Sequence, residues 1–331
     1  MARIVLGIGT SHSPLLVLGG PQWEFRSEDD RRNKSLNTLD GRLVSYDDLV
    51  KERGEPYLKE SDPAGFPAMA SRAEAALDRL AAELRAAEPD VVLVVGDDQG
   101  ELFGPENFPA MAIYRGEELV MKPSEHLKGM PPWADQKFWS GYRMDLPHRY
   151  PGAPELALDL VHGLIRQGVD VASSDRVLDP SVRGFGHAFG FVIERLMKDV
   201  NVPMLPVMLN TYFPPNTPTA ARCYEVGTKI ATALAASSNP ARVAVVASGG
   251  LSHFLCEEAF DRRIVAALQT NDADTLTAIP QEAMLSGSSE IRNWVMVSGM
   301  VTGLKSDYME YIPVHRTPLG SGIGLAFMSW K

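Results

Sequence analysis

The sequence has little cysteine and no long apolar run, and these absences exclude several classes of protein. Only two cysteines, Cys223 and Cys256, occur in 331 residues. That number excludes a disulfide framework and a cysteine-based zinc site, and it fits a reducing cytosol. No apolar run approaches the ~18 residues that span a bilayer, and residue 1 leads directly into a strand-like stretch without a signal peptide. We therefore expect a cytoplasmic protein with no membrane partner.

The chain also lacks the positive charge that binding to nucleic acid requires. It has 32 Lys and Arg against 42 Asp and Glu, which gives a formal net charge of −10. Because affinity for nucleic acid depends on Lys and Arg at the phosphates, we expect no nucleic-acid partner. A small anionic substrate held by one or two local cations stays compatible with this charge.

Three widespread enzyme signatures are missing. The segment Gly7–Gly9 begins like a dinucleotide-binding fingerprint, but His12 stands where the third glycine is required. There is no phosphate-binding P-loop. The serine–glycine segments at Ser248 and Ser286 do not supply the Gly-x-Ser-x-Gly elbow of a serine hydrolase. Dinucleotide, nucleotide and serine-hydrolase chemistry are therefore not indicated.

What the sequence does contain is an alternation of short apolar runs and helical patterns. The runs predict buried parallel strands at Ile4–Ile8, Val91–Val95, Met204–Leu209 and Val243–Ala247. Helical spacing of apolar residues predicts helices at Ser71–Glu88, Glu155–Arg166, Ala188–Lys198, Thr219–Ala236 and Glu257–Gln269. This order predicts an α/β fold, a single domain over residues 1–331 with a central, mostly parallel sheet flanked by helices.

Two stretches interrupt the alternation. Residues 19–68 are polar and predict a long irregular excursion over the surface, such as a lid or a subunit contact. Residues 104–150 are also irregular and contain Pro131 and Pro132, with aromatic residues at Trp133, Trp139 and Tyr142. We expect this second stretch to cover a pocket.

Polar residues follow each predicted strand directly. His12 follows the first strand, the segment Gly96–Gln99 the second, Asn210 the third and His253 the fourth. Ligands of open α/β sheets bind at the carboxyl ends of the strands, so these side chains are expected to converge on one edge. Asp97, Asp98 and Asn210 are equally typical of turns and helix caps.

Two further candidates lie at predicted helix starts. His187 opens a helix after Gly186, and Glu290 lies in the first turn of another helix. Each has a purely structural alternative, because N-terminal turns favour hydrogen-bonding and acidic side chains without any catalytic role.

Five motifs in this order resemble a known family, the class III extradiol ring-cleavage dioxygenases. They are Gly-Thr-Ser-His-Ser-Pro at 9–14, Gly-Asp-Asp-Gln at 96–99, Gly-His-Ala-Phe-Gly at 186–190, Gly-Gly-Leu-Ser-His at 249–253 and the segment Ser288–Trp294. The resemblance includes Pro203–Pro215 and the tail from Arg316 to Gly322, so it spans nearly the whole chain. It is similar to the catalytic subunit of protocatechuate 4,5-dioxygenase and more similar to the 3-O-methylgallate dioxygenase branch.

The resemblance implies a non-haem Fe(II) site with two histidines and one carboxylate. Carried over by motif, His12 is a metal ligand, Glu290 is the carboxylate ligand, His253 is the catalytic histidine and His187 is a second catalytic histidine of the pocket. One position departs from the protocatechuate enzymes, in which the second strand ends in a histidine ligand. Here that position is Gln99, so the remaining ligand is Gln99 itself, Asp98 or His187.

The implied activity is cleavage of a catechol-type ring, such as gallate, 3-O-methylgallate or protocatechuate, with O₂. His187 or His253 would take a phenolic proton, and His253 would then act as the general acid. Two alternatives are a non-enzymatic scaffold of the same fold and a zinc hydrolase built on His12, Asp98 and His253. We expect a small aromatic substrate, O₂ and a homo-oligomer, most simply a homodimer, as partners. Candidates to hold a substrate carboxylate are Arg292, Arg316, Tyr212 and Thr317.

Overall fold

A computed structural model of the chain describes residues 1–123 and 136–331 and confirms the α/β fold with a central sheet. The prolines at 131 and 132 and Trp133 lie outside the described residues. Four parallel strands form the centre of the sheet, in the spatial order β1 (Arg3–Thr10), β10 (Arg242–Ser248), β4 (Val91–Asp97) and β9 (Met204–Leu209). These are the four strands that the apolar runs predict.

The flanks of the sheet are antiparallel, which the apolar runs did not indicate. On one side, β13 (Ser321–Trp330) pairs with β1, and its other partners are β11 (His253–Leu255) and β12 (Ser306–His315). On the other side, β5 (Met111–Tyr114) is antiparallel to β9 and carries β8 (Ala172–Ser174). Two small ribbons lie apart from the sheet: β2 (Leu36–Asn37) with β3 (Leu43–Val44), and β6 (Glu118–Val120) with β7 (Arg149–Pro151).

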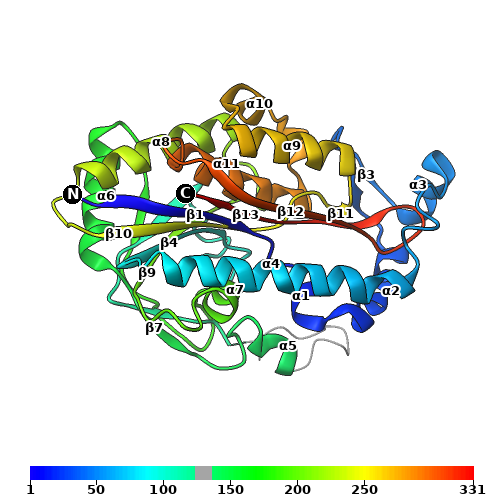
Figure 1. Cartoon of the computed structure of the whole chain (residues 1–331), viewed down its shortest axis with the longest axis horizontal. Helices are drawn as coiled ribbons and strands as arrows, with labels where there is room; N and C mark the ends of the chain where they lie inside the picture. Colours follow the sequence, from blue (N-terminus) through cyan, green and yellow to red (C-terminus); the bar gives the residue numbers. More distant parts are fainter. Residues whose placement is uncertain (124–135) are drawn as a thin grey trace.

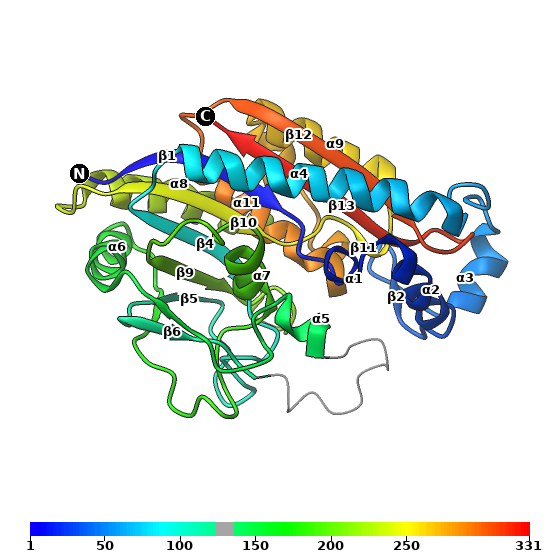
Figure 2. The same cartoon turned by 60° about the horizontal axis from the view of Figure 1, so that its bottom comes forward.

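Helices cover both faces of the sheet (Figures 1 and 2). One layer contains α6 (Pro154–Arg166), α8 (Ala220–Ala236), α9 (Glu258–Thr270), α10 (Ala273–Thr277) and α11 (Ile291–Met300). The other contains α1 (Leu15–Leu18), α4 (Phe66–Ala86), α5 (Gln136–Ser140) and α7 (His187–Arg195). Alternation along β4 explains the two cores, because Leu93 packs under the first layer and Val94 under the second. Within the described residues, no helix is both long and apolar enough to cross a membrane.

Residues 19–68, predicted to be irregular, contain α2 (Trp23–Arg31), α3 (Tyr46–Arg53) and the β2–β3 ribbon. Trp23 is fully buried, and its indole N–H donates to the carbonyl of Leu15. Asp30 accepts two hydrogen bonds from the guanidinium of Arg316 at 2.7 and 3.0 Å, and both side chains are buried. This segment is therefore held against the sheet, and its role as a lid or subunit contact stays a prediction.

The packing of α7 depends on a glycine. A Cβ atom at Gly190 would overlap the backbone carbonyl of Tyr142. A backbone group cannot move aside by changing its rotamer, as a flexible side chain can. We expect Gly190→Ala to lower the free energy of unfolding by about 1–3 kcal/mol, as overpacking of a core does. Denaturant unfolding measures this change in the free energy of unfolding. Gly303→Ala is the control, because a Cβ at Gly303 meets no atom within 4 Å. Equal stability of the two variants would contradict this packing.

Candidate metal centre and active site

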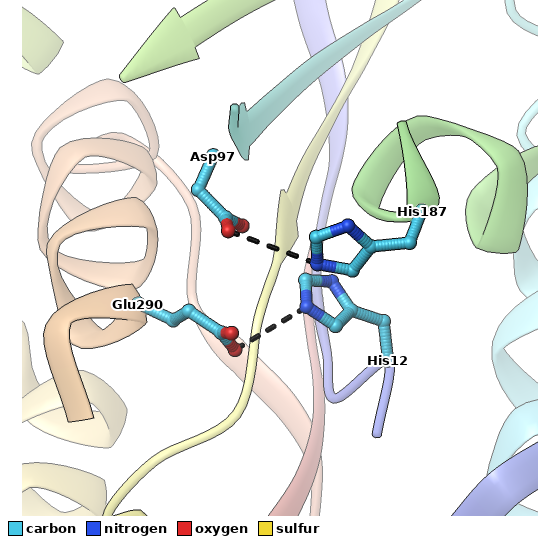
Figure 3. Close-up of side chains that lie close together, drawn as sticks. All are labelled: His12, Asp97, His187 and Glu290. Carbon is cyan, nitrogen blue, oxygen red and sulfur yellow. Dashed lines mark ion pairs between the residues drawn. The ribbon is translucent and has the colours of Figure 1, made fainter. Parts of the chain in front are cut away.

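Four ionisable side chains converge at the carboxyl edge of the central strands (Figure 3). His12 follows β1, Asp97 ends β4, His187 begins α7, and Glu290 ends the 3₁₀ turn η5 (Ser286–Glu290) just before α11. Each offers one ligand atom, and these atoms all lie within 4.8 Å of one another. No other such group was found among residues 1–123 and 136–331. The sheet edge thus assembles the histidines and acid that the motifs indicate, together with Asp97.

The hydrogen bonds of His12 determine where its ring proton lies. The single hydroxyl proton of Ser248 is donated to the carbonyl of Ala188 at 2.6 Å. Ser248 must therefore accept from Nδ1 of His12, which is 3.0 Å from its oxygen. In the neutral imidazole the lone pair is then on Nε2, which is buried without a hydrogen-bond partner and lies 3.3 Å from Oε2 of Glu290. This nitrogen is available to a metal ion.

His187 is oriented in the same way, by a carboxylate. Its Nδ1 lies 2.6 Å from Oε1 of Glu101, and the other oxygen of Glu101 accepts the backbone N–H of Gln99. Burial is the largest single influence and would lower the pKa of His187. The charge and hydrogen bond of Glu101, together with the charges of Asp97 and Glu290, outweigh it and raise that pKa to about 10. Burial likewise opposes the ionised Glu101, whose pKa His187 holds at about 2. Nε2 of His187 is left facing Asp97, 3.8 Å from Oδ2.

Glu290 lies between two imidazoles. Its Oε2 accepts the backbone N–H of Gly250 at 2.6 Å, and its Oε1 is 3.5 Å from Nε2 of His253. Burial works against its charge, yet His12 and His253 hold the pKa of this carboxyl well below its usual range. The sequence placed Glu290 in the first turn of a helix, but it is the N-cap residue of α11, and its carboxylate faces the cluster instead of capping that helix.

Asp97 is the member of the cluster that the sequence analysis did not single out as a ligand. It is fully buried; Oδ2 accepts the amide of Gln99 at 2.9 Å, and Oδ1 has no hydrogen-bond partner. Burial and the nearby Glu290 raise its pKa. The sequence carries no signal that separates Asp97 from Asp98, because the burial of all seven residues of β4 is seen only in the structure.

The other two residues of the Gly96–Gln99 motif have different surroundings. Asp98 accepts backbone N–H groups of Glu101, Leu102 and Phe103, so it closes the turn after β4, as its structural alternative predicts. Gln99 is exposed, lines the cavity described below, and directs its amide N–H at Asp97. The structure therefore does not bring together His12, Asp98 and His253, the residues required for the zinc hydrolase, because the carboxylate of Asp98 is bonded to the turn.

His253 stands beside the cluster at the start of β11. Its Nδ1 is 2.8 Å from the carbonyl of Leu251, which can only accept, so Nδ1 carries a proton. Nε2 faces Glu290 and is the nitrogen that can exchange a proton with a bound molecule. Burial is the largest single influence and would lower the pKa of His253, but Glu290 and the carbonyl of Leu251 together raise it above its usual value.

These observations fit a divalent metal ion. Two imidazole nitrogens and two carboxylates point at one volume, and two of their buried atoms, Nε2 of His12 and Oδ1 of Asp97, have no partner within the described part of the protein. Each of the four side chains also has an outer hydrogen-bond partner, namely Ser248, Glu101, Gln99 or the N–H of Gly250. Such outer hydrogen bonds are typical of protein metal sites.

A cavity of about 320 Å³ opens onto the cluster. One wall is largely aromatic and apolar and contains Phe138, Trp139, Tyr142, Met144, Phe254 and Ile323. Arg26 of α2, Lys122 and Arg316 add positive charge. The pocket is therefore apolar with a few placed polar groups, as sites for small molecules usually are.

Only two of the four expected carboxylate partners line this cavity, Arg316 and Tyr212. Arg292 is fully buried and donates to the carbonyls of Pro218 and Met284, so it supports the backbone. Thr317 is bonded to Ser321 and is not part of the cavity wall. Arg26 was not anticipated, because it lies in the polar stretch 19–68, whose folding brings it to the site.

A buried histidine–carboxylate cluster in an apolar cavity, at the carboxyl edge of an α/β sheet, has the composition and position of an enzyme site that could hold a metal ion and a small molecule. The family described as the catalytic LigB subunit of aromatic ring-opening dioxygenase matches residues 67–324, more than three quarters of the chain. The protein belongs to this family and is an extradiol ring-opening dioxygenase. The match includes Asp97, His187, His253 and Glu290, whereas His12 precedes it.

Proposed function

We propose that the protein is an Fe(II)-dependent extradiol dioxygenase in which His12, His187 and Glu290 are metal ligands and Asp97 completes the site. The observation that carries this proposal is the unpartnered Nε2 of His12, buried 3.3 Å from Glu290 and facing the centre of the cluster. Two histidines and a carboxylate with open neighbouring positions are typical of non-haem Fe(II) oxygenases. Of the three possible replacements for the family's second histidine ligand, His187 is the one directed at the centre.

Gln99 has a supporting role in this proposal. Its amide N–H donates to Oδ2 of Asp97, so it orients a carboxylate of the site from the solvent side. An amide bonded in this way resembles the outer partners that fix ligand geometry in metal sites. The departure from the family pattern at position 99 therefore does not argue for a non-enzymatic scaffold.

The side chains around the centre have separable tasks. Iron, when bound, supplies the electron transfer between an aromatic diol and O₂. The aromatic residues of the cavity orient the ring and exclude water. Glu101 holds the Nδ1 proton of His187, so that Nε2 is free to bind the metal. His253 exchanges a proton through Nε2 while Nδ1 stays bonded to Leu251. No other imidazole of the described residues combines a protonated, anchored Nδ1 with an Nε2 that faces the cavity outside the ligand set.

We further propose a substrate with an anionic substituent. Arg26 is half-buried and lines the cavity, where a guanidinium can donate charge-assisted hydrogen bonds to a carboxylate. Arg316 also lines the cavity, but Nε and one terminal nitrogen of its guanidinium donate to Asp30. A ring carrying a carboxylate, as in gallate-like compounds, matches a cavity with the metal cluster and Arg26 on its wall.

The test is O₂ uptake by anaerobically purified, Fe(II)-loaded protein with catechol, protocatechuate, gallate and 3-O-methylgallate. We expect ring opening of the carboxylated compounds, and Arg26→Met should raise their KM by about 10–100-fold, the range for a charge-assisted hydrogen bond. The KM of unsubstituted catechol should not change. Arg32→Met, which removes an exposed arginine just after the same helix, is the control.

Two results would count against this proposal. If Arg26→Met raises the KM of catechol and of the carboxylated compounds by the same factor, Arg26 is not the anion partner. No O₂ uptake with any diol, together with activity in zinc under anaerobic conditions, would contradict the iron dioxygenase. The expected homo-oligomer stays a prediction that sedimentation of the same samples tests.

A further inference from the structure

We infer that Ser288 is a positioning residue that sets the place of His253 relative to Glu290. The inference rests on the proposed role of His253 in proton transfer, but the contacts that carry it are independent of any metal. Ser288 lies in η5, two residues before Glu290, and the residue is 2% exposed.

The hydroxyl of Ser288 binds both polar backbone groups of His253. It accepts the N–H of His253 at 3.0 Å and donates its own proton to the carbonyl of His253 at 2.9 Å. One side chain thus uses both its donor and its acceptor capacity on a single residue. This pair of bonds fixes the Cα position of His253, and with it the origin of the imidazole.

The same short turn contacts the ring itself. A Cβ atom at Gly287 would overlap Cδ2 of His253 and would approach Nε2 to 2.6 Å, so the imidazole lies directly on this glycine. Glu290, at the end of the turn, lies 3.5 Å from Nε2 of His253. Residues 287, 288 and 290 therefore define the plane, the backbone position and the charge partner of His253 from one rigid element.

The residue before His253 has its own anchor, which keeps the loop folded when Ser288 is changed. Oδ1 of the buried Asp261 accepts the N–H of Ser252 at 2.9 Å, and Oδ2 accepts the Ser252 hydroxyl at 2.7 Å. Loss of the Ser288 hydroxyl should therefore release His253 without unfolding its loop. Proton transfer is sensitive to such a release, because a misplacement of about 1 Å can cost about 10²-fold in rate.

The neighbouring Ser289 is a matched control. It is a fully buried serine of the same turn, and its hydroxyl has no hydrogen-bond partner. Ser289→Ala therefore removes the same oxygen from the same environment without removing a contact to His253. A general effect of substitution in this turn would appear in both variants.

The experiment compares Ser288→Ala, Ser288→Thr and Ser289→Ala with the unaltered protein. For Ser288→Ala we expect unchanged iron content and KM, a kcat lower by about 10–100-fold, and less ring-opened product per O₂ consumed. Ser288→Thr retains the hydroxyl and should recover part of kcat, while Ser289→Ala should match the unaltered protein. Crystal structures of both alanine variants give the distance from Nε2 of His253 to Glu290, a readout that does not depend on an activity assay.

Specific outcomes would overturn the inference. An unmoved His253 in the Ser288→Ala crystal structure would do so, as would equal kcat losses in the two alanine variants. Loss of iron in step with loss of product would show a structural role only. If the unaltered protein consumes no O₂, the proposed function fails, whereas a displaced His253 in Ser288→Ala alone still supports the positioning role.

Discussion

Replacing Glu290 by glutamine is expected to remove both metal binding and ring opening. The amide keeps the shape of the side chain and can still accept the N–H of Gly250, so the turn should stay folded. What is lost is the negative charge between His12 and His253, which favours a divalent cation in a buried site. Loss of an outer hydrogen bond alone typically lowers metal affinity by about 10–100-fold, and loss of a ligand should exceed that.

Iron content after dialysis and the rate of product formation measure this outcome together. Glu282→Gln is the control, because Glu282 is an exposed glutamate eight residues earlier, outside the cavity wall. The same thermal unfolding midpoint in both variants would show that the fold is intact. Full iron occupancy in Glu290→Gln would remove Glu290 from the ligand set and leave Asp97 as the carboxylate.

The candidate metal centre shows which residues of such a cluster a sequence can predict. His12, His187, His253 and Glu290 each follow a strand or begin a helix, and the strand-end rule brings them to one edge. That rule depends only on the order of strands and helices, which apolar periodicity predicts well here for the four central strands. The positions of these side chains therefore follow from local pattern and general topology.

Local pattern could not predict which of Asp97, Asp98 and Gln99 faces the cluster. Adjacent residues at a strand end point in opposite directions, so one of two aspartates faces the cluster and the other faces the turn. Which one does so depends on the register of β4 against β9, where Asp97 is opposite Leu209. The backbone N–H groups that Asp98 accepts come from a turn whose shape no local pattern specifies.

Arg26 is a second residue of the site that the sequence did not predict. Composition alone indicated that residues 19–68 are surface, because the stretch is rich in charge. The ion pair of Asp30 with Arg316 closes a contact between residues 286 positions apart, and it brings α2 to the cavity. Long-range pairs of this kind leave no periodic signal.

His253→Gln is expected to slow ring opening by about 10²–10⁴-fold while iron stays bound, the range for loss of a general acid or base. An amide cannot exchange a proton near neutral pH, whereas Nε2 of His253 can do so while Nδ1 remains bonded to Leu251. Iron content and single-turnover product formation measure the two effects, and His162→Gln on the exposed side of α6 is the control. The comparison with Glu290→Gln is informative because the two side chains are only 3.5 Å apart. If both variants lose iron, His253 is part of the ligand set; if only Glu290→Gln does, metal binding and proton transfer belong to different residues of one cluster.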